Sequence, residues 1–275
     1  MIDILLSTYN GQLYLSQQIE SILHQTWADW HLYIRDDGST DNTAAIIEQY
    51  VSAYPKQITW INKQDVHNVG VIKSFQQLLE QSTAPYFMFC DQDDVWLSSK
   101  VELTYQCLKN EENQMGNDKP IVVHTDAKVV DANLQVMNPS FFDVLRFPYR
   151  IIATNKHYAM LFNYITGCTV MGNAKAREVS LPFPSFIDMH DSWVARKAWL
   201  EQGKVVSLLE PTMLYRQHGG NVLGAGNKLT FKKRMQSFVY AYKQYRLLYK
   251  KHRWMAPFSF IYYKCKFNVL YANNQ

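Results

Sequence analysis

The sequence lacks three features that would place it in other protein classes. No stretch of its 275 residues approaches the run of about 18 apolar residues that a membrane-spanning helix needs. Its four cysteines are scattered and have no Cys-x-x-Cys spacing, which argues against a zinc site and a disulfide framework and indicates a reducing compartment. No signal-peptide pattern precedes the strand-like Ile2–Leu6, so we expect a cytoplasmic protein.

Acidic residues are missing from the last quarter of the chain. All 24 Asp and Glu residues lie within 1–210, whereas 211–275 holds 12 Lys and Arg and no acid. Beyond Leu229 the pattern is helical, basic and aromatic, which predicts an extension over 226–275 that binds an anionic partner. We expect that partner to be the inner face of the cytoplasmic membrane. The alternative is that the aromatic residues pack on the rest of the protein and the lysines face water.

The first 110 residues alternate strand and helix patterns, which predicts parallel strands joined by right-handed crossovers. The expected strands are Ile2–Ser7, Leu32–Arg35, Ile58–Ile61 and Tyr86–Cys90, and the expected helices are Leu13–Gln25, Thr40–Tyr54, Val71–Gln81 and Lys100–Leu108. Further along we expect strands at Ile121–His124, Ala127–Val130, Tyr164–Gly172 and Val205–Leu209, and a helix at Asp191–Gln202. The chain is therefore expected to adopt an α/β fold with a mostly parallel sheet flanked by helices.

The most informative segment is an apolar run that ends abruptly in a cluster of acids. Tyr86–Cys90 is followed at once by Asp91, Asp93 and Asp94. Carboxylates so close together repel each other and need a counter-charge. A hard divalent cation shared with a phosphate group would supply it, and ligands of open α/β sheets bind at the carboxyl ends of strands. We therefore predict metal-dependent chemistry on a phosphorylated substrate at this strand end.

Other polar loops follow strands at the same predicted edge. Thr8-Tyr9-Asn10 opens onto a helix and could offer backbone N–H groups to phosphate, with Tyr9 stacking on a base. In Arg35–Asp41, one of the two adjacent acids could accept hydrogen bonds from a base or a ribose, although a turn capped by Ser39 or Asp41 is the ordinary explanation of that loop. Asn68-Val69-Gly70, followed by Lys73, is a third loop of this kind.

Two later motifs carry candidate catalytic groups. Asp191 lies at the start of a predicted helix, where an acid is common, but it could also act as a general base. His218 follows Arg216 in a polar loop and could bind a metal ion or a phosphate. The basic C-terminal segment alone would fit nucleic-acid binding equally well, but the acidic motifs do not, so we expect no nucleic-acid partner.

A second enzyme class fits the acidic cluster. Asp91-x-Asp93 at the end of an apolar strand is the spacing by which a haloacid-dehalogenase-type phosphatase places its nucleophile and its acid/base. In such phosphatases the motif usually lies on the first strand, whereas here it lies on the fourth. We keep this as the alternative hypothesis.

With these motifs assembled, the chain resembles family 2 glycosyltransferases of the GT-A fold. It is most similar to the rhamnosyltransferase-like branch of bacterial polysaccharide biosynthesis. The segments that carry the resemblance are Leu5–Gly11, Ile19–Thr26, Arg35–Asp41, Phe89–Trp96, His190–Trp193 and Tyr215–Asn221. The resemblance implies a catalytic domain over 1–225, with a nucleotide-binding half at 1–115 and an acceptor-binding half at 116–225, followed by the extension at 226–275.

The resemblance and the motifs together give an expected role to each candidate residue. Asp191 would be the catalytic base, and Mg²⁺ or Mn²⁺ would be held by Asp91, Asp93 and His218. The residues expected to bind the nucleotide and donor are Thr8, Tyr9, Asn10, Asp37, Asn68, Lys73, Asp91 and Gln92. The residues expected in the sugar and acceptor pocket are Asp94, Trp96, Asp126, Gly167, Cys168, His190 and Trp193.

The implied activity is an inverting, metal-dependent transfer of a sugar from a nucleotide-sugar donor to a hydroxyl group of a glycan. The donor would be dTDP-rhamnose or a UDP-hexose such as UDP-glucose. We expect the acceptor to be lipid-linked and to belong to a bacterial surface polysaccharide, and an acceptor on a surface glycoprotein is the alternative. The enzyme would then be peripheral on the inner face of the plasma membrane.

Overall fold

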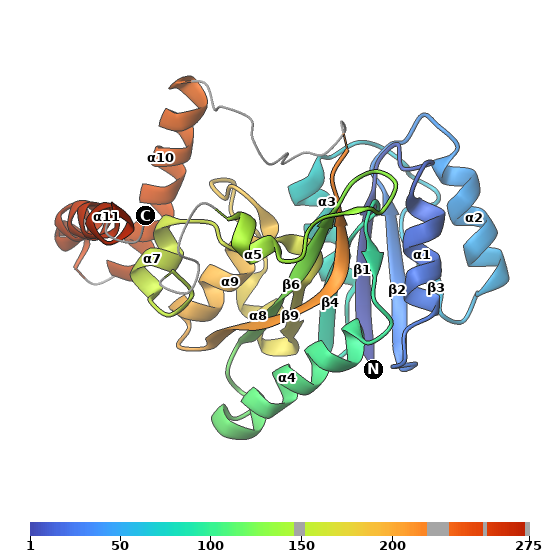
Figure 1. The fold of residues 1–275 in the computed structure, drawn as a ribbon, viewed down its shortest axis with the longest axis horizontal. Helices are drawn as coiled ribbons and strands as arrows, with labels where there is room; N and C mark the ends of the chain where they lie inside the picture. Colours follow the sequence, from blue (N-terminus) through green and yellow to red (C-terminus); the bar gives the residue numbers. More distant parts are fainter. Residues whose placement is uncertain (146–151, 219–230, 250–251, 273–275) are drawn as a thin grey trace.

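The structure is a computed structural model that describes residues 1–145, 152–218, 231–249 and 252–272. Its described strands form a nine-stranded sheet in the order β3-β2-β1-β4-β8-β6-β9-β5, with β7 paired to β6. Helices cover both faces of the sheet, and the C-terminal helices lie at the end of the molecule opposite α2 (Figure 1). The predicted α/β fold is confirmed.

The nucleotide-binding half that was predicted from the sequence is a parallel sheet with crossover helices. Its strands are β1 (Ile2–Thr8), β2 (Trp30–Asp36), β3 (Ile58–Trp60) and β4 (Tyr86–Asp91), and every neighbouring pair among them is parallel. Its helices are α1 (Leu15–Leu23), α2 (Thr43–Ala53) and α3 (Val71–Gln81). The four strand predictions and the first three helix predictions of this half are confirmed, with ends that differ by up to three residues, whereas the helix expected at Lys100–Leu108 continues to Met115.

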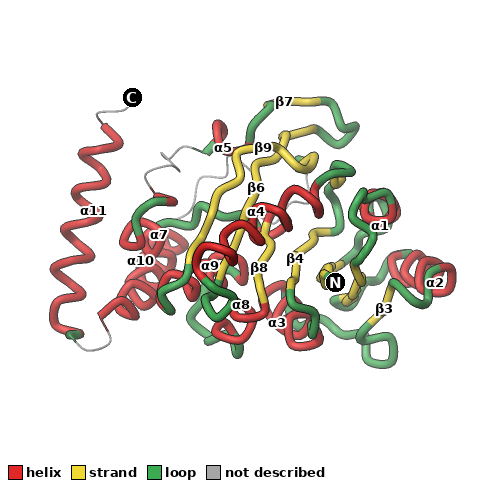
Figure 2. Tube along the Cα trace, turned by 90° about the horizontal axis from the view of Figure 1, so that it is seen from below, coloured by secondary structure: helices red, strands yellow, loops and turns green. Residues whose placement is uncertain are grey.

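The alternation of side chains along β1 builds two hydrophobic cores. Ile4 and Leu6 face a core shared with α1, α2 and α4 (Lys100–Met115), whereas Leu5 faces a second core shared with α3 and α9 (His190–Leu200). Figure 2 shows α1 and α4 on one side of the strands and α3 on the other. Because both faces are covered, the strands are apolar along most of their length.

The second half of the sheet is mixed. It contains β5 (Val95–Trp96), β6 (Ile121–Val130), β7 (Val136–Asn138), β8 (Val170–Asn173) and β9 (Lys204–Arg216), together with the short helices α5 (Phe141–Val144), α7 (Lys156–Leu161) and α8 (Ala174–Ser180). β8 is antiparallel to both β4 and β6, and β9 is parallel to β6.

Three boundaries in this half differ from the prediction. The two strands expected at 121–124 and 127–130 are the single strand β6. The strand expected at Tyr164–Gly172 is wrong in its first part, because Gly167–Thr169 form a 3-10 turn, η1, and the strand begins only at Val170. The strand expected at Val205–Leu209 continues as β9 to Arg216, with a shift of register against β6 near Pro211.

The C-terminal helices pack on the second core. They are α10 (Phe231–Tyr245), the 3-10 turns η2 (Arg246–Tyr249) and η3 (Arg253–Met255), and α11 (Ala256–Ala272). Tyr245, Phe260 and Phe267 are buried members of the core that also contains Phe75 and Val194. The expected boundary at 225/226 lies outside the described residues, and no helix within the described part of the chain is both long and apolar enough to cross a bilayer.

Candidate active site

The acidic cluster lies where the parallel strands end. Ser7 of β1 is in register with Arg35 of β2 and with Asp91 of β4, so the loops after these strands meet at one edge of the sheet. Helix α1 anchors the segment after β4, because the Ser21 hydroxyl accepts a hydrogen bond from the Trp96 backbone N–H at 3.0 Å. Gln25, two residues after the end of α1, donates to the Leu97 carbonyl at 2.8 Å. The motif Ile19–Thr26 therefore acts by fixing the acidic loop.

Asp91, Asp94 and Cys168 bring their ligand atoms within 4.8 Å of one another. Asp94 is fully buried, and its Oδ2 has no hydrogen-bond partner. Burial, together with the charge of Asp93, raises the pKa of Asp91 to about 7. Burial and the neighbouring acids also raise the pKa of Asp94 well above its ordinary range. The protein therefore supplies too little positive charge to keep all of these carboxyl groups ionised, and a bound cation would favour their ionised form.

Asp93 points to a different partner. Its Oδ2 lies 2.8 Å from Nε2 of His218, and the ring of His218 is 4.9 Å from that of Tyr14. The structure thus brings together the predicted metal ligands Asp93 and His218, although they are far apart in the sequence. The ligand atoms of Asp91 cluster with those of Asp94 and Cys168.

Arg216 holds this loop in place. Its Nε donates to the Asp93 carbonyl at 2.7 Å, and its backbone N–H donates to Oδ1 of Asp94 at 3.1 Å. Its other nitrogens donate to the Ala132 carbonyl at 2.7 Å and to the Gln17 side chain. The guanidinium also lies over the ring of Tyr14, with 4.5 Å from Cζ to the ring centroid. The buried guanidinium of Arg216, with this many directed hydrogen bonds, holds the acidic loop in one position and places a positive charge beside it.

Arg216→Lys is expected to lower the free energy of unfolding by about 2 kcal/mol, because an ammonium group cannot replace the forked donors and leaves buried carbonyls without a partner. Chemical denaturation of the two proteins measures the difference. Arg253→Lys, at an exposed position, is the matched control and should change nothing measurable. An equal loss in both variants would contradict the role of Arg216.

The predicted base Asp191 lies in the first turn of α9, beside η1. A Cβ atom on Gly167 would lie 3.6 Å from Oδ2 of Asp191 and 2.9 Å from Nε2 of His190, so glycine is required for this close approach. His190 is buried between Phe75, on which its ring stacks at 3.8 Å, and Phe89. Both of its ring nitrogens lack a partner, and burial lowers its pKa to about 3, so it is a neutral group.

The carboxyl group of Asp191 is well suited to accept a proton near neutral pH. Burial raises its pKa to about 7, and the charges of Asp188 and Asp91 act in the same direction. Its Oδ1 accepts the Ser192 backbone N–H at 2.6 Å, which orients the group. Gly167 lies against Asp191, and the next residue, Cys168, has its sulfur within 4.8 Å of the carboxylate oxygens of Asp91 and Asp94, so η1 connects the candidate base to the acidic cluster.

The loop after β1 is tied to the acidic loop through Gln92. The Gln92 Oε1 accepts from the hydroxyl of Thr8 at 2.5 Å and from the backbone N–H of Tyr9 at 2.9 Å. Asn10 has a left-handed backbone (φ 49°), and its side chain accepts the Thr40 N–H at 2.8 Å. Tyr9 is about half exposed at the rim. These contacts bring together the predicted donor-binding residues of the first and fourth strand ends.

Asp37 organises the second and third loops. Its Oδ1 accepts from Arg35 at 2.6 Å and from the Val69 N–H at 2.7 Å, and its Oδ2 accepts from the Gly70 N–H at 3.0 Å. Asn68 and Lys73 are exposed beside this loop. The predicted cap residues behave differently from one another, because Asp41 accepts the Thr43 N–H at 3.0 Å while the Ser39 hydroxyl donates to Asp36.

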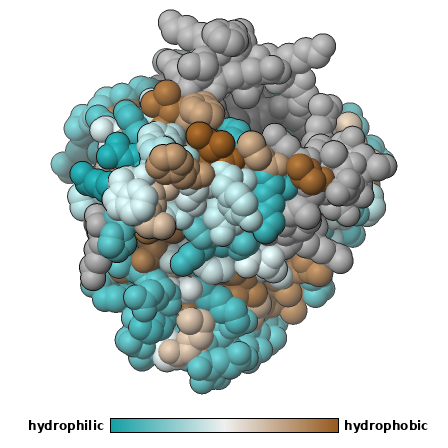
Figure 3. Space-filling view, turned by 90° about the vertical axis from the view of Figure 1, so that its left-hand side faces the viewer, coloured by the Kyte–Doolittle hydropathy of each residue, from teal (hydrophilic) through white to brown (hydrophobic). Residues whose placement is uncertain are grey.

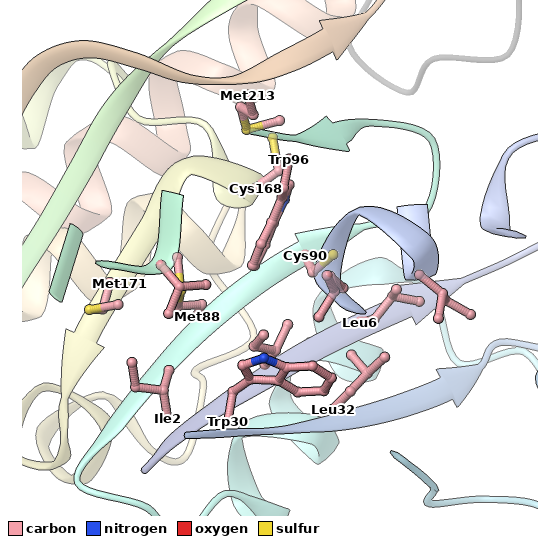
Figure 4. Close-up of a cluster of buried hydrophobic side chains, with 14 of the residues drawn as sticks. Ile2, Leu6, Trp30, Leu32, Met88, Cys90, Trp96, Cys168, Met171 and Met213 are labelled. Atoms are coloured by element: carbon pink, nitrogen blue, oxygen red, sulfur yellow. The ribbon is translucent and has the colours of Figure 1, made fainter. Parts of the chain in front are cut away.

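Three predicted pocket residues have contacts within the fold. Trp96 lies in the first core beside Cys168 and Met213 (Figure 4). Asp126 accepts hydrogen bonds from Ala127, Ser140 and Phe142, and so anchors α5. Trp193 donates to the Ser180 carbonyl at 2.9 Å. Their roles toward a sugar or an acceptor stay predictions.

Sequence reasoning did not assign roles to several residues that shape the site. Arg35 is fully buried and pairs with Asp37, and Lys100 is fully buried with its Nζ 5.0 Å from the centre of the Trp96 ring. Burial lowers the pKa of Lys100 to about 8. Arg35 precedes Asp36 and Asp37 in a motif quoted above, and this position was the available signal, whereas Arg216 has no acid near it in the sequence. Nothing in the sequence marks Lys100, because a lysine at a helix start is ordinary.

The comparisons with known proteins agree with this geometry. A family model described as "Glycosyl transferase family 2" matches residues 3–201, and the chain therefore belongs to this family of sugar-transferring enzymes. A similar curated protein is the dTDP-rhamnosyl transferase RfbG of Shigella flexneri, which is 27% identical over 238 residues, 80% of this chain and 74% of the relative. Membership of the family decides against the phosphatase hypothesis.

Solved structures show the same fold. TarS 1–349 of S. aureus in complex with UDP superposes with a TM-score of 0.62 at 16% identity, over 89% of this chain and 65% of that chain. The mannosyltransferase PcManGT of Pyrobaculum calidifontis, in complex with GDP-Man and Mn²⁺, has a TM-score of 0.59 at 14% identity, over 94% of this chain and 71% of that chain. The predicted GT-A fold is thereby confirmed.

Proposed function

We propose that this glycosyltransferase moves a sugar from a nucleotide-sugar donor to a hydroxyl group of a glycan acceptor, with inversion at the anomeric carbon. The observation that carries the proposal is that Gly167 and Cys168 of η1 lie against Asp191 on one side and against Asp91 and Asp94 on the other, although about 100 residues separate Asp91 from Asp191 in the sequence. One group would accept a proton and the other would face the diphosphate.

The residues of the chain support a single displacement. The carboxylate of Asp191 would accept the proton of the acceptor hydroxyl as its oxygen attacks the anomeric carbon, and the nucleoside diphosphate would leave from the opposite side. Its position at the start of α9, with Gly167 in contact, leaves the carboxylate next to the acidic loop. No enzyme nucleophile is needed in this scheme, and one displacement inverts the configuration.

The acidic loop fits a divalent cation. Its donors are carboxylate oxygens, the ligands that Mg²⁺ and Mn²⁺ prefer, and Asp94 has a buried oxygen without a partner. Asp91 and Asp93 would hold the ion, with His218 beside Asp93. The cation would neutralise the charge of the departing diphosphate. PcManGT was solved with Mn²⁺, which supports the same requirement here.

Similar curated proteins named for the synthesis of teichoic acid and teichuronic acid support a role in the synthesis of bacterial surface polysaccharide. RfbG is a dTDP-rhamnosyl transferase, and TarS was solved with UDP, so we propose dTDP-rhamnose or a UDP-hexose as the donor. We further propose that the acceptor is lipid-linked and that the enzyme is peripheral on the inner face of the membrane, held by its basic C-terminal segment.

A thermal-shift measurement with UDP, dTDP, GDP and CDP, in Mn²⁺ or Mg²⁺, tests the donor site. Saturating nucleotide is expected to raise the melting temperature by about 5 °C, because a ligand that binds only the folded state stabilises it by mass action. Asp93→Ala should abolish the metal-dependent part of the shift.

The matched control is Asp29→Ala, which removes an exposed carboxylate at the opposite edge of the sheet and should leave the shift unchanged. No shift with any of these nucleotides in the presence of metal would overturn the proposed donor site. If the metal-dependent shift persists in Asp93→Ala, the proposed nucleotide site stands, but the proposed binding of metal by Asp93 is wrong.

A further inference from the structure

The last helix, α11, is apolar on two opposite faces. Ala256, Phe260 and Phe267 point inward and are buried. On the other side, a row of large apolar side chains that we call the outer stripe is exposed. Its members, with their exposed fractions, are Trp254 of η3 (70%), Phe258 (72%), Ile261 (61%), Tyr262 (56%) and Val269 (62%). Their spacing of three, four and seven residues puts them on one helical face.

The inner face fixes α11 to the rest of the protein. The His157 ring of α7 stacks on Tyr263 at 4.0 Å, and its Nδ1 lies 2.9 Å from the hydroxyl of Tyr245. The Ser259 hydroxyl joins the same network, 2.7 Å from that of Tyr245. The outer stripe therefore stands on a packed helix, and its exposure is not the result of an unanchored tail.

The side chains of α10 and η2 give a contrasting picture. Tyr242, Leu247, Leu248 and Tyr249 pack against the second core, and Tyr245 is completely buried. These residues were expected from the sequence to face a lipid surface. These side chains instead pack on the protein, as the alternative hypothesis predicted, so they do not form a lipid-facing surface.

The charged residues that the structure describes on η3 and α11 are all positive. The Lys266 Nζ is 5.6 Å from the centre of the Tyr262 ring and Arg253 precedes Trp254, whereas the Lys264 Nζ lies over the buried ring of Phe260. No acidic residue occurs in 211–275. Figure 3, which faces this end of the molecule, shows hydrophobic side chains in a band among hydrophilic ones. Apolar and aromatic side chains flanked by lysines are the composition of a surface that lies in a bilayer interface.

We propose that the outer stripe of α11 is the surface by which this protein docks on an anionic lipid bilayer, with Trp254, Phe258 and Ile261 inserted among the acyl chains. This proposal deepens the membrane setting of the proposed function and replaces α10 by α11 as the contact surface. An exposed apolar row of this size on a packed helix indicates an interaction site. The uniform positive charge favours anionic lipid over a second copy of the chain, since two such faces would repel each other.

Vesicle co-sedimentation of the full chain tests the proposal. The probes are vesicles of phosphatidylglycerol with phosphatidylethanolamine, and vesicles of phosphatidylcholine alone. The test variant is Phe258→Ser/Ile261→Ser, and the matched control is Val136→Ser/Met137→Ser, which removes two apolar side chains of similar exposure, 58% and 65%, from β7.

The wild-type protein and the control are expected to bind the anionic vesicles, and to bind phosphatidylcholine vesicles more weakly. The test variant should bind the anionic vesicles at least about tenfold more weakly, since burial of each Phe or Ile side chain in lipid is worth about a factor of ten or more. Its melting temperature and its nucleotide-induced shift should equal those of the control. Vesicle binding and the nucleotide-induced shift are therefore independent measurements, so the lipid proposal can be wrong while the proposed donor site is right, or the donor site wrong while the lipid proposal is right.

Three results would overturn the proposal. The first is a wild-type protein that does not bind anionic vesicles. The second is a test variant that binds them as well as the control does. The third is a wild-type dimer in sedimentation velocity that the test variant converts to a monomer, which would make the outer stripe a contact between two copies.

Discussion

Asp191→Asn will lower the rate of sugar transfer by about 10² to 10⁴-fold, which is the range expected when a positioned general base is removed. The amide cannot accept the proton of the acceptor hydroxyl, but it keeps the size of the side chain and the oxygen that accepts the Ser192 N–H. The fold and the nucleotide site should therefore persist. The measurement is the initial rate of transfer, together with the nucleotide-induced thermal shift.

The control for this experiment is Asp143→Asn, which changes an exposed carboxylate of α5 and should leave the rate unaffected. A rate for Asp191→Asn within a few fold of wild type would show that another group takes the proton. Loss of the nucleotide-induced shift would instead show that Asp191 acts on donor binding.

The same substitution, Asp191→Asn, will make the protein more stable, and the gain will grow with pH. Burial raises the pKa of Asp191 to about 7 from an ordinary value of 3.8. The folded state therefore favours the protonated carboxyl group. The stability of the wild-type protein is unaffected by this group below the unfolded pKa of 3.8, and it falls as the pH rises from there through about 7, because the unfolded chain releases the proton more readily than the folded protein does. The asparagine side chain is neutral at every pH, so the variant does not lose stability in this way.

Chemical denaturation at pH 5, 6.5 and 8 measures this effect. The difference in the free energy of unfolding between variant and wild type should rise from under about 2 kcal/mol at pH 5 to about 4 kcal/mol at pH 8. Comparing the two proteins at each pH largely cancels the other titrating groups, including His124 and His190. A difference that does not depend on pH would mean that Asp191 ionises as an ordinary surface carboxylate does.

The parallel half of the fold could be predicted because its signals are local. Short apolar strands alternate with helices, and each strand ends in polar residues, so the edge that carries Thr8, Asp37 and Asp91 follows from the direction of the strands. The later part was harder to predict. Gly167–Thr169 reads as strand because its neighbours are apolar, but the close approach of His190 and Asp191 bends it into a turn.

The connections across the site could not be read from the sequence. Arg216 bonds to Asp93, Asp94 and Gln17, and Gln92 bonds to Thr8 and Tyr9, and each of these contacts spans more than 80 residues. The extent of β9 was underestimated because Pro211, which lacks a backbone donor, usually marks the end of a strand. Here it coincides with a shift of register against β6.

The hydrogen bonds of Arg196 have a consequence for engineering. Arg196 of α9 bonds to Asp188, at 2.8 Å, and to Gln244 of α10, and Gln244 also donates to Asp188 at 3.1 Å. The segment that leads into Asp191 is thus fastened to a helix that comes more than 40 residues later. A chimera that exchanges the C-terminal helices between relatives would have to bring a partner for Arg196 with them, or the proposed catalytic carboxylate of Asp191 would lose its support along with the proposed lipid contact.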